Sequence, residues 1–150
     1  MQVPSDSIDI RRAFQRHRSS FQLLGLSRRS RFVLLFYAAE CGLKYLIMTS
    51  QTLPTTDHLK SSLRTMLGLS KKAVELHDIE QLCTAANVLP VDVGFAPAPF
   101  TVNSASFPAY KMHEAARYGV KVPEPYISDV EVWLAAVVTE VAKRLTAQGV

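Results

Sequence analysis

The chain has 150 residues, of which 48% are hydrophobic and 20% are charged. This composition excludes a disordered chain and suits one domain with a hydrophobic core, which we assign to residues 1–150. The net charge of +4 is unevenly placed, because residues 1–31 hold seven arginines against two aspartates.

A first helix is predicted after residues 1–6, which we expect to fray. Asp6 or Ser7 can cap it, because short polar side chains accept hydrogen bonds from the first free N–H groups of a helix. Apolar or ring side chains then recur at spacings of three and four, which is typical of a helix packed along one seam. These side chains are Ile10, Phe14, His17, Phe21 and Leu24.

The longest apolar stretch, residues 31–48, follows Ser27, which is a candidate cap. Its apolar residues recur at helical spacing, and this predicts a helix that is buried on most of its surface. A membrane span needs roughly 20 mostly apolar residues, and Glu40 and Lys44 near the middle argue against one. No membrane partner is therefore expected.

Glu40 and Lys44 are four residues apart, in the order that favours an ion pair on a helix. Two interpretations stay open, a solvated or half-buried ion pair and a polar pair that faces a cleft or a partner subunit. Gly42 lies between them and predicts a close crossing with another helix, since glycine is otherwise unfavourable inside a helix.

After a turn at Pro54, a short helix is predicted from a cap at Thr56 or Asp57 to Gly68. Asp78 is the candidate cap of the next helix. Residues 87–105 are predicted to form one long loop, because they contain three prolines and no convincing strand pattern.

A further helix is predicted from Ser106 and Pro108 to Arg117 and Tyr118, since proline suits a first helical turn. Residues 122–125 are expected to be extended.

The last helix is predicted to start at Ser128–Glu131, which has the pattern of a capping box. It reaches about Ala147, and Trp133 on it is expected to be half-buried.

Cys41 and Cys83 lie within apolar helical patterns and are predicted to be free, buried thiols. Cys83 follows His77 by six residues without further ligands at zinc spacing, so no metal is expected. His58 and His113 fall on polar helix faces without a paired ligand. No cofactor is indicated, and the polar, then basic, first residues are unlike a signal peptide, so a cytoplasmic location is expected.

The basic beginning of the chain consists of arginine alone. Arginine favours bidentate contacts with phosphate or carboxylate, so RNA, another nucleic acid or an acidic protein is a candidate partner. The alternative is the solvated face of a helix. The seven candidate binding residues are Arg11, Arg12, Arg16, Arg18, Arg28, Arg29 and Arg31.

Three blocks of the chain follow one another in an order known from a protein family. They are Tyr37–Lys44, then His77–Leu82, then Arg117–Tyr118 before the last helix. Over roughly residues 7–147 the chain thereby resembles the HEPN superfamily of helical domains. The resemblance implies an all-α, up-and-down bundle of four to five helices, here with one long proline-containing loop. It also implies a homodimer and a role in prokaryotic defence, toxin–antitoxin or stress systems.

Many HEPN proteins are metal-independent ribonucleases with an arginine followed, after four to six residues, by a histidine on or near the last helix. Here no histidine follows Arg117, and the nearest match is Arg12 with His17 on the first predicted helix. The candidate catalytic residues are therefore His17, Arg12, His77 and Arg117. The polar residues expected to be structural or to line a cleft are Glu40, Lys44, Asp78 and Tyr118.

The leading prediction is a HEPN-like module that binds RNA, a nucleotide or a cognate protein and lacks the usual ribonuclease motif. One alternative is a metal-independent ribonuclease toxin, in which histidine moves a proton and arginine stabilises phosphate charge. A second alternative is a non-enzymatic scaffold subunit of a protein complex.

Overall fold

A computed structural model describes residues 5–102, 104–118 and 121–149, and the side chains of Val102, Ala116 and Arg117 lie outside the description. The described chain is mostly helical, with one small antiparallel sheet. Its elements are α1 (Ser7–Phe21), α2 (Arg28–Ser50), the 3-10 helix η1 (Thr56–His58), α3 (Leu59–Leu67), α4 (Ile79–Ala85), α5 (Pro90–Val93), β1 (Phe100–Val102), β2 (Ala105–Phe107), the 3-10 helix η2 (Ala109–Lys111), α6 (Met112–Tyr118) and α7 (Glu124–Ala147).

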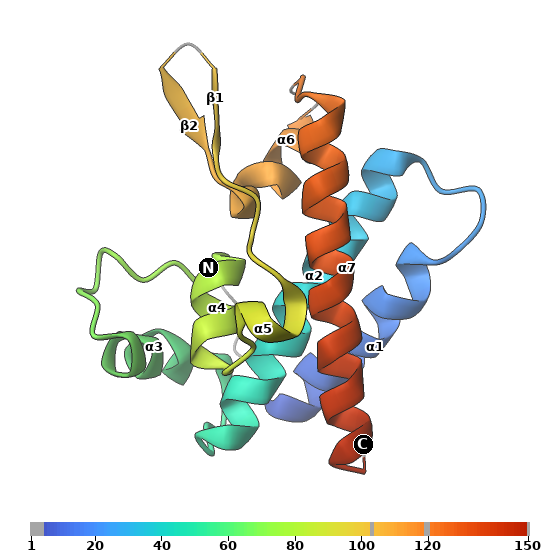
Figure 1. Cartoon of the computed structure of the whole chain (residues 1–150). Helices are drawn as coiled ribbons and strands as arrows, with labels where there is room; N and C mark the ends of the chain where they lie inside the picture. The colour runs from blue at the N-terminus through green and yellow to red at the C-terminus, as the bar shows by residue number, and fades with distance from the viewer. Residues whose placement is uncertain (1–4, 103, 119–120, 150) are drawn as a thin grey trace.

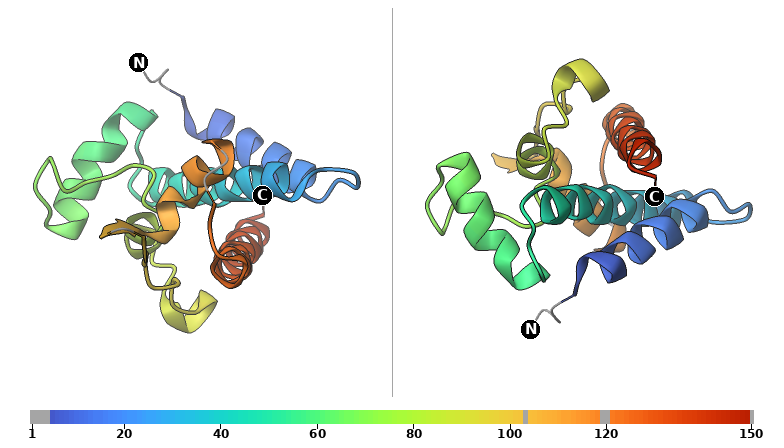
Figure 2. Two further views of the ribbon diagram at one scale, coloured as in Figure 1. Left: turned by 90° about the horizontal axis from the view of Figure 1, so that it is seen from above. Right: turned by 90° about the horizontal axis from the view of Figure 1, so that it is seen from below.

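The predicted central helix is confirmed as α2, which runs through the middle of the molecule (Figure 1). Views from above and below show α1 and α7 on different sides of it (Figure 2). Helices α4 and α6 also contact α2. Its length and composition would suffice to cross a membrane, and 72% of its most apolar window is buried inside the fold.

Gly42 lies where α1 and α7 closely approach α2, as the sequence predicted. A Cβ atom at this position would lie 2.7 Å from Cγ1 of Val141 and 2.9 Å from Cδ2 of Phe14. Both distances are shorter than a carbon–carbon contact allows. The absence of a side chain therefore lets the three helices share one core, to which Phe14, Phe36 and Val141 all belong.

Most of the predicted helix ends are confirmed. Asp6, Ser27 and Asp78 cap α1, α2 and α4 with side-chain oxygens that accept backbone N–H groups at 2.8 to 3.2 Å. Gly68 ends α3 with a φ of +64°, a conformation that glycine adopts without strain. The predicted side-chain cap at Thr56 or Asp57 is absent, and the turn η1 leads into α3 instead.

The expected fraying of residues 1–6 is wrong for the two of them that the structure describes. The backbone N–H of Ser5 donates to Oγ1 of Thr56 at 3.1 Å, and the N–H of Thr56 donates to the carbonyl oxygen of Ser5 at 2.9 Å. Asp6 caps α1. Residues 1–4 lie outside the described residues.

The prediction of one long loop over residues 87–105 is also wrong. This segment forms the single turn α5 and then enters a hairpin in which Phe100 pairs with Phe107 across β1 and β2. The rings of Phe100 and Phe107 stack at 5.3 Å, and Tyr126 of α7 packs against Phe100 at 4.9 Å. Tyr126 also donates its hydroxyl to the carbonyl oxygen of Phe107 at 3.1 Å. Contacts with α7 thus stabilise strands too short for a sequence pattern to reveal.

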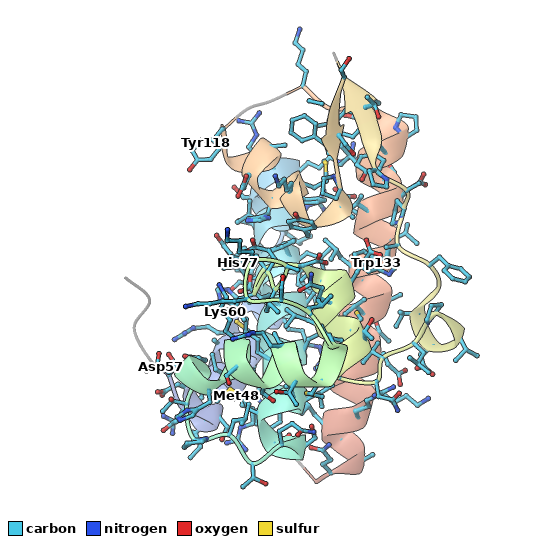
Figure 3. The ribbon with its side chains drawn as sticks, turned by 90° about the vertical axis from the view of Figure 1, so that its left-hand side faces the viewer. Met48, Asp57, Lys60, His77, Tyr118 and Trp133 are labelled. Carbon is cyan, nitrogen blue, oxygen red and sulfur yellow. The ribbon has the colours of Figure 1, made fainter. Side chains whose placement is uncertain are left out.

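Helix α7 begins at Glu124, four residues before the predicted capping box. Residues 124 and 125, expected to be extended, form its first turn, which accepts Pro125 because the first N–H groups have no helical partner. Ser128 and Glu131 bind the guanidinium of Arg28 on α2. Trp133, expected to be half-buried, is only 5% exposed (Figure 3).

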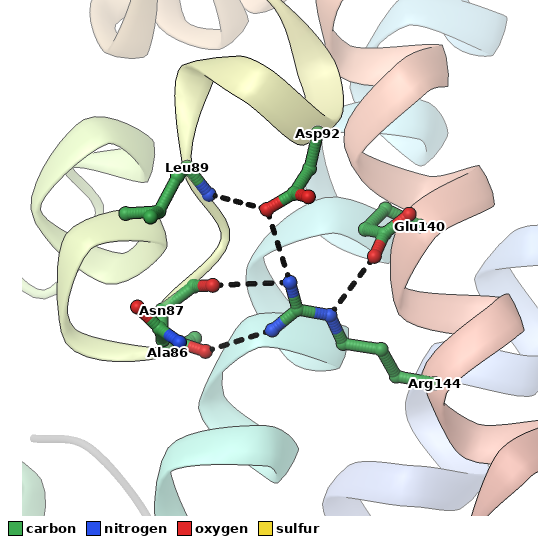
Figure 4. A network of polar contacts seen from close by, with 6 residues as sticks. All are labelled: Ala86, Asn87, Leu89, Asp92, Glu140 and Arg144. Atoms are coloured by element: carbon green, nitrogen blue, oxygen red, sulfur yellow. Dashed lines mark hydrogen bonds and ion pairs between the residues drawn. The ribbon is translucent and has the colours of Figure 1, made fainter.

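The C-terminal part of α7 is tied to the segment between α4 and α5 by one arginine (Figure 4). Arg144 donates to the carbonyl oxygens of Ala86 at 3.2 Å and Asn87 at 3.0 Å. It also lies 3.2 Å from Oδ2 of Asp92 and 3.0 Å from Oε1 of Glu140. These contacts satisfy carbonyl groups at the end of α4, which has no further helical turn to receive them.

Candidate functional site

The ion pair predicted on α2 is present, and it is buried. Nζ of Lys44 lies 2.5 Å from Oε1 of Glu40, and the two residues are only 5% and 6% exposed. This burial excludes the solvated or half-buried interpretation. Removing two charges from water is unfavourable unless further polar groups join them, and one such group lies nearby.

His77 joins this pair from the segment that precedes α4. Its Nδ1 atom lies 3.0 Å from Oε1 of Glu40, the same oxygen that binds Lys44. The second carboxylate oxygen, Oε2, is buried and has no hydrogen-bond partner among the described residues. The side chain of His77 is 46% exposed, so it connects the buried pair to the surface.

Four ring side chains lie in a row across this part of the molecule. His17 of α1 lies 5.7 Å from Tyr37 of α2, Tyr37 lies 6.3 Å from His113 of α6, and His113 lies 6.2 Å from His77, all measured between ring centroids. We call these residues, His17, Tyr37, His113 and His77, the ring row. Through Tyr37 and His113 it links two predicted candidates, His17 and His77, that are sixty positions apart in the sequence.

Sequence reasoning missed His113, which it placed on a polar helix face. The residue is buried, stacks on the Phe36 ring at 4.0 Å, and has Nδ1 2.6 Å from the carbonyl oxygen of Tyr110. Helix α6 has only seven residues, too few for a period that would identify its inner face. The histidine predicted to lie on a polar face is therefore the buried member of the ring row.

The pKa values of the titratable groups in the site are shifted in opposite directions. Burial alone would raise the pKa of Glu40, but the hydrogen bond from His77 and the charge of Lys44 hold it below its ordinary value. The hydrogen bond to Glu40 raises the pKa of His77. Burial lowers the pKa of His17, with help from Arg16, and burial also lowers the pKa of His113. The site thus favours a charged His77 beside two neutral imidazoles.

The seven candidate arginines do not share one environment. Arg28 binds Glu124 and Glu131, so its charge is neutralised within the chain. Arg11 is half-buried, and its Nε atom has no hydrogen-bond partner. Within the described residues, the ion pairs of these seven side chains are confined to Arg28. The exposed members form what we call the arginine strip: Arg12, Arg16, Arg18, Arg29 and Arg31.

Arg16 connects the arginine strip to the ring row. Its positive charge lowers the pKa of the adjacent His17, and it also acts on Cys41 of α2. No acidic residue occurs between Asp9 and Glu40, so the strip has no compensating charge along its own segment. Arg16 is therefore the member of the arginine strip whose charge acts on the site.

The remaining predicted residues lie apart or have structural roles. Asp78 is the cap of α4. Tyr118 is exposed at the end of α6, and Figure 3 labels it together with His77. The side chain of Arg117 lies outside the described residues, so it is not assigned to this site.

The two cysteines are free thiols, as predicted, with Cys83 buried and Cys41 half-buried. Burial raises the pKa of Cys41 to about 11 and that of Cys83 to about 12. Among the residues that the structure describes, no three histidine, cysteine, aspartate or glutamate side chains form a group that could hold a metal ion.

Comparisons of the chain with protein-family models, with curated proteins and with solved structures found no match.

Proposed function

We propose that this chain is a HEPN-like module that binds RNA through the arginine strip. The observation behind the proposal is the exposure of five arginines along α1 and the start of α2, none of which has an acidic partner among the residues that the structure describes. The proposal includes the helical-bundle arrangement of that superfamily, a cytoplasmic setting in prokaryotic defence or toxin–antitoxin systems, and a homodimeric state.

Exposed arginines without ion pairs favour a phosphate backbone for a simple reason. Each guanidinium that contacts a phosphate releases counterions from the nucleic acid, so binding weakens as salt is added. Arg12 and Arg16 are four residues apart and therefore lie on one side of α1, where they can contact neighbouring phosphates. Arg28 contributes less to phosphate binding than its position in the sequence suggests, because Glu124 and Glu131 already bind it.

The test is the salt dependence of binding to a labelled single-stranded RNA of about 20 nucleotides, measured by fluorescence anisotropy between about 50 and 200 mM salt. We expect the logarithm of the binding constant to fall steeply with the logarithm of salt concentration. The double variant Arg12→Gln/Arg16→Gln should bind more weakly and with a shallower slope, by about 0.7 for each phosphate that it no longer neutralises.

Lys71→Gln/Lys72→Gln is the matched control, since it removes the same charge from exposed residues outside the strip. An equal loss of binding in both double variants would show that net charge alone matters and would overturn the assignment to α1. Salt-independent binding, or no binding, would reject the RNA proposal and leave an acidic protein as the partner.

The ring row favours a second candidate function, a metal-independent ribonuclease. A charged His77 and a neutral His17 are the protonation states that a general acid and a general base need. We expect such an activity to persist in a metal chelator and to be lost in His17→Gln or His77→Gln with the fold intact. Unchanged cleavage in both variants would eliminate these two residues.

The scaffold alternative and the homodimer have their own supporting observation, a set of exposed apolar side chains. Phe95 and Val132 are both largely exposed, and with Trp133 they line a surface hollow between α7 and the segment after α5. Val132→Glu would place a charge there. We expect light scattering after size exclusion to report a smaller species for this variant, while an unchanged mass would place any dimer contact elsewhere.

A further inference from the structure

The ring row differs from the aromatic core in its exposure and its neighbours. Phe36 is completely buried, whereas the next residue, Tyr37, is only half-buried, as is His17. His77 is exposed over nearly half of its side chain. Planar side chains thus reach the surface from α1, from α2 and from the segment before α4, next to Arg16 of the arginine strip.

The rings of the row are held in place from below. Phe36 stacks on His113 with an angle of 17° between the rings, which covers one face of that imidazole. His113 in turn lies between Tyr37 and His77, at 6.3 and 6.2 Å. The buried Glu40 fixes His77 through the bond to Nδ1. These contacts reduce the freedom of the rings, which lowers the entropy lost when a flat ligand packs on them.

We propose that the ring row binds unpaired bases, so that the nucleic acid recognised by this chain is single-stranded. This inference rests on the RNA-binding function proposed above and names the class of ligand. Tyr37, His17 and His77 would each offer a ring to a base, while Arg16 contacts the adjacent phosphate and His113 serves as the support.

The geometry of the row suits separated bases better than a continuous stack. His17 and Tyr37, the two proposed base-binding rings that are direct neighbours, are tilted by 41° with centroids 5.7 Å apart, so bases stacked on them cannot remain parallel to each other. Bases in a loop or a flexible single strand can be splayed in this way, and they commonly stack on aromatic side chains. In a duplex, the faces of the bases are covered by their neighbours and cannot reach the row.

Stacking on rings tolerates any base, because every base has a flat π face. The row therefore predicts a preference for single strands over duplexes and little preference for sequence. It distinguishes strandedness, whereas the arginine strip supplies affinity for any phosphate backbone. The two contributions are separable by experiment.

The experiment measures anisotropy with a labelled uridine-rich strand of about 20 nucleotides, alone and annealed to its complement. We expect the single strand to bind about tenfold more tightly than the duplex. Tyr37→Leu should reduce the affinity for the single strand about tenfold, keep the affinity for the duplex, and keep the salt slope of the original chain.

His58→Leu is the matched control, because it removes an exposed ring outside the ring row and should change neither affinity. His17→Gln serves as a second variant should Tyr37→Leu fail to fold, and it should show the same selective loss. Equal binding of strand and duplex, or full single-strand affinity in both ring variants, would overturn the inference. If salt-dependent binding persists in that case, RNA binding by the arginine strip stands and only the role of the ring row is rejected. If nothing binds, the proposed RNA-binding function itself fails.

Discussion

Nδ1 of His77 lies 3.0 Å from Oε1 of Glu40, although the two residues are 37 positions apart. The same oxygen binds the ammonium group of Lys44. One carboxylate oxygen therefore connects α2 to the segment before α4, and it orients His77, whose side chain is nearly half exposed. Changes at Glu40, Lys44 and His77 should affect both the stability of the fold and the charge of the site.

The buried ion pair predicts a large loss of stability when only one partner is removed. Lys44→Met would leave the carboxylate of Glu40 in a buried position with His77 as its remaining partner. We expect a loss of about 3–5 kcal/mol in the free energy of unfolding, measured by urea denaturation, because the buried carboxylate loses the ammonium group and keeps only the partly exposed His77 as a counter-charge.

The double variant Glu40→Leu/Lys44→Met is the control for this effect. It removes both charges, so it should lose much less stability than the two single variants predict together. Additive losses would mean that the two side chains act independently and that the pair is not the reason for the destabilisation.

His77 predicts a specific dependence of stability on pH. The hydrogen bond to Glu40 raises its pKa in the folded state above the ordinary value of 6.5, so the folded chain holds this proton more tightly than the unfolded chain. Its contribution to stability is complete below about pH 6.5 and is lost as pH rises through the folded pKa. The charged groups that act on His77 besides Glu40 are Lys44 of α2 and Glu75 of its own segment.

The measurement compares His77→Gln with the original chain by urea denaturation. The variant should be less stable by a larger margin at about pH 6 than at about pH 9. The variant must be compared with the original chain at each pH, because His17 and His113 change the stability with pH in the direction opposite to His77. Burial lowers their pKa, so their contribution weakens as pH falls below 6.5. A margin that is constant across this range would contradict the assigned role of His77.

Gly42 predicts a steric effect at the crossing of α1, α2 and α7. Gly42→Ala should improve helix propensity by up to about 1 kcal/mol, but its methyl group would overlap Val141 and Phe14. Overpacking of this kind costs about 1–3 kcal/mol, so we expect a net loss of thermal stability. The double variant Gly42→Ala/Val141→Ala should recover part of this loss. If Gly42→Ala alone is more stable than the original chain, the helices can move apart without penalty and the steric prediction is wrong.

Arg144 predicts a local effect on the segment between α4 and α5. Arg144→Lys keeps the charge but cannot bind the carbonyl oxygens of Ala86 and Asn87 together with Asp92 and Glu140. We expect a loss of about 1–3 kcal/mol in the free energy of unfolding and faster amide hydrogen exchange over residues 86–94. Lys143→Gln, at the exposed neighbouring position, should leave exchange in this segment unchanged.

Local rules in the sequence predicted the long helices and their ends well. Asp6, Ser27 and Asp78 cap helices because the free N–H groups they satisfy lie within three residues. The order of Glu40 before Lys44 likewise predicted their pair. Each of these features depends on neighbours in the chain, which the sequence displays directly.

Features that depend on distant residues could not be predicted in the same way. The hairpin needs Tyr126, which lies 19 positions after Phe107. The apparent capping box at Ser128 serves a different purpose, because Arg28, 100 positions earlier, binds its hydroxyl group. The position of His113 in the ring row follows from the packing of α6 on α2, and α6 is too short for a helical pattern of apolar residues to predict which of its faces is buried.

The two free thiols, one buried and one half-buried, can be used to follow how this fold opens. With a pKa of about 11, Cys41 exists as the reactive thiolate in only about one molecule in ten thousand at neutral pH, and Cys83 is less reactive still. Alkylating reagents should therefore modify them mainly during excursions that expose α2 or α4 to water. The two labelling rates, resolved by mass spectrometry, would show whether these helices separate from the core together or one at a time.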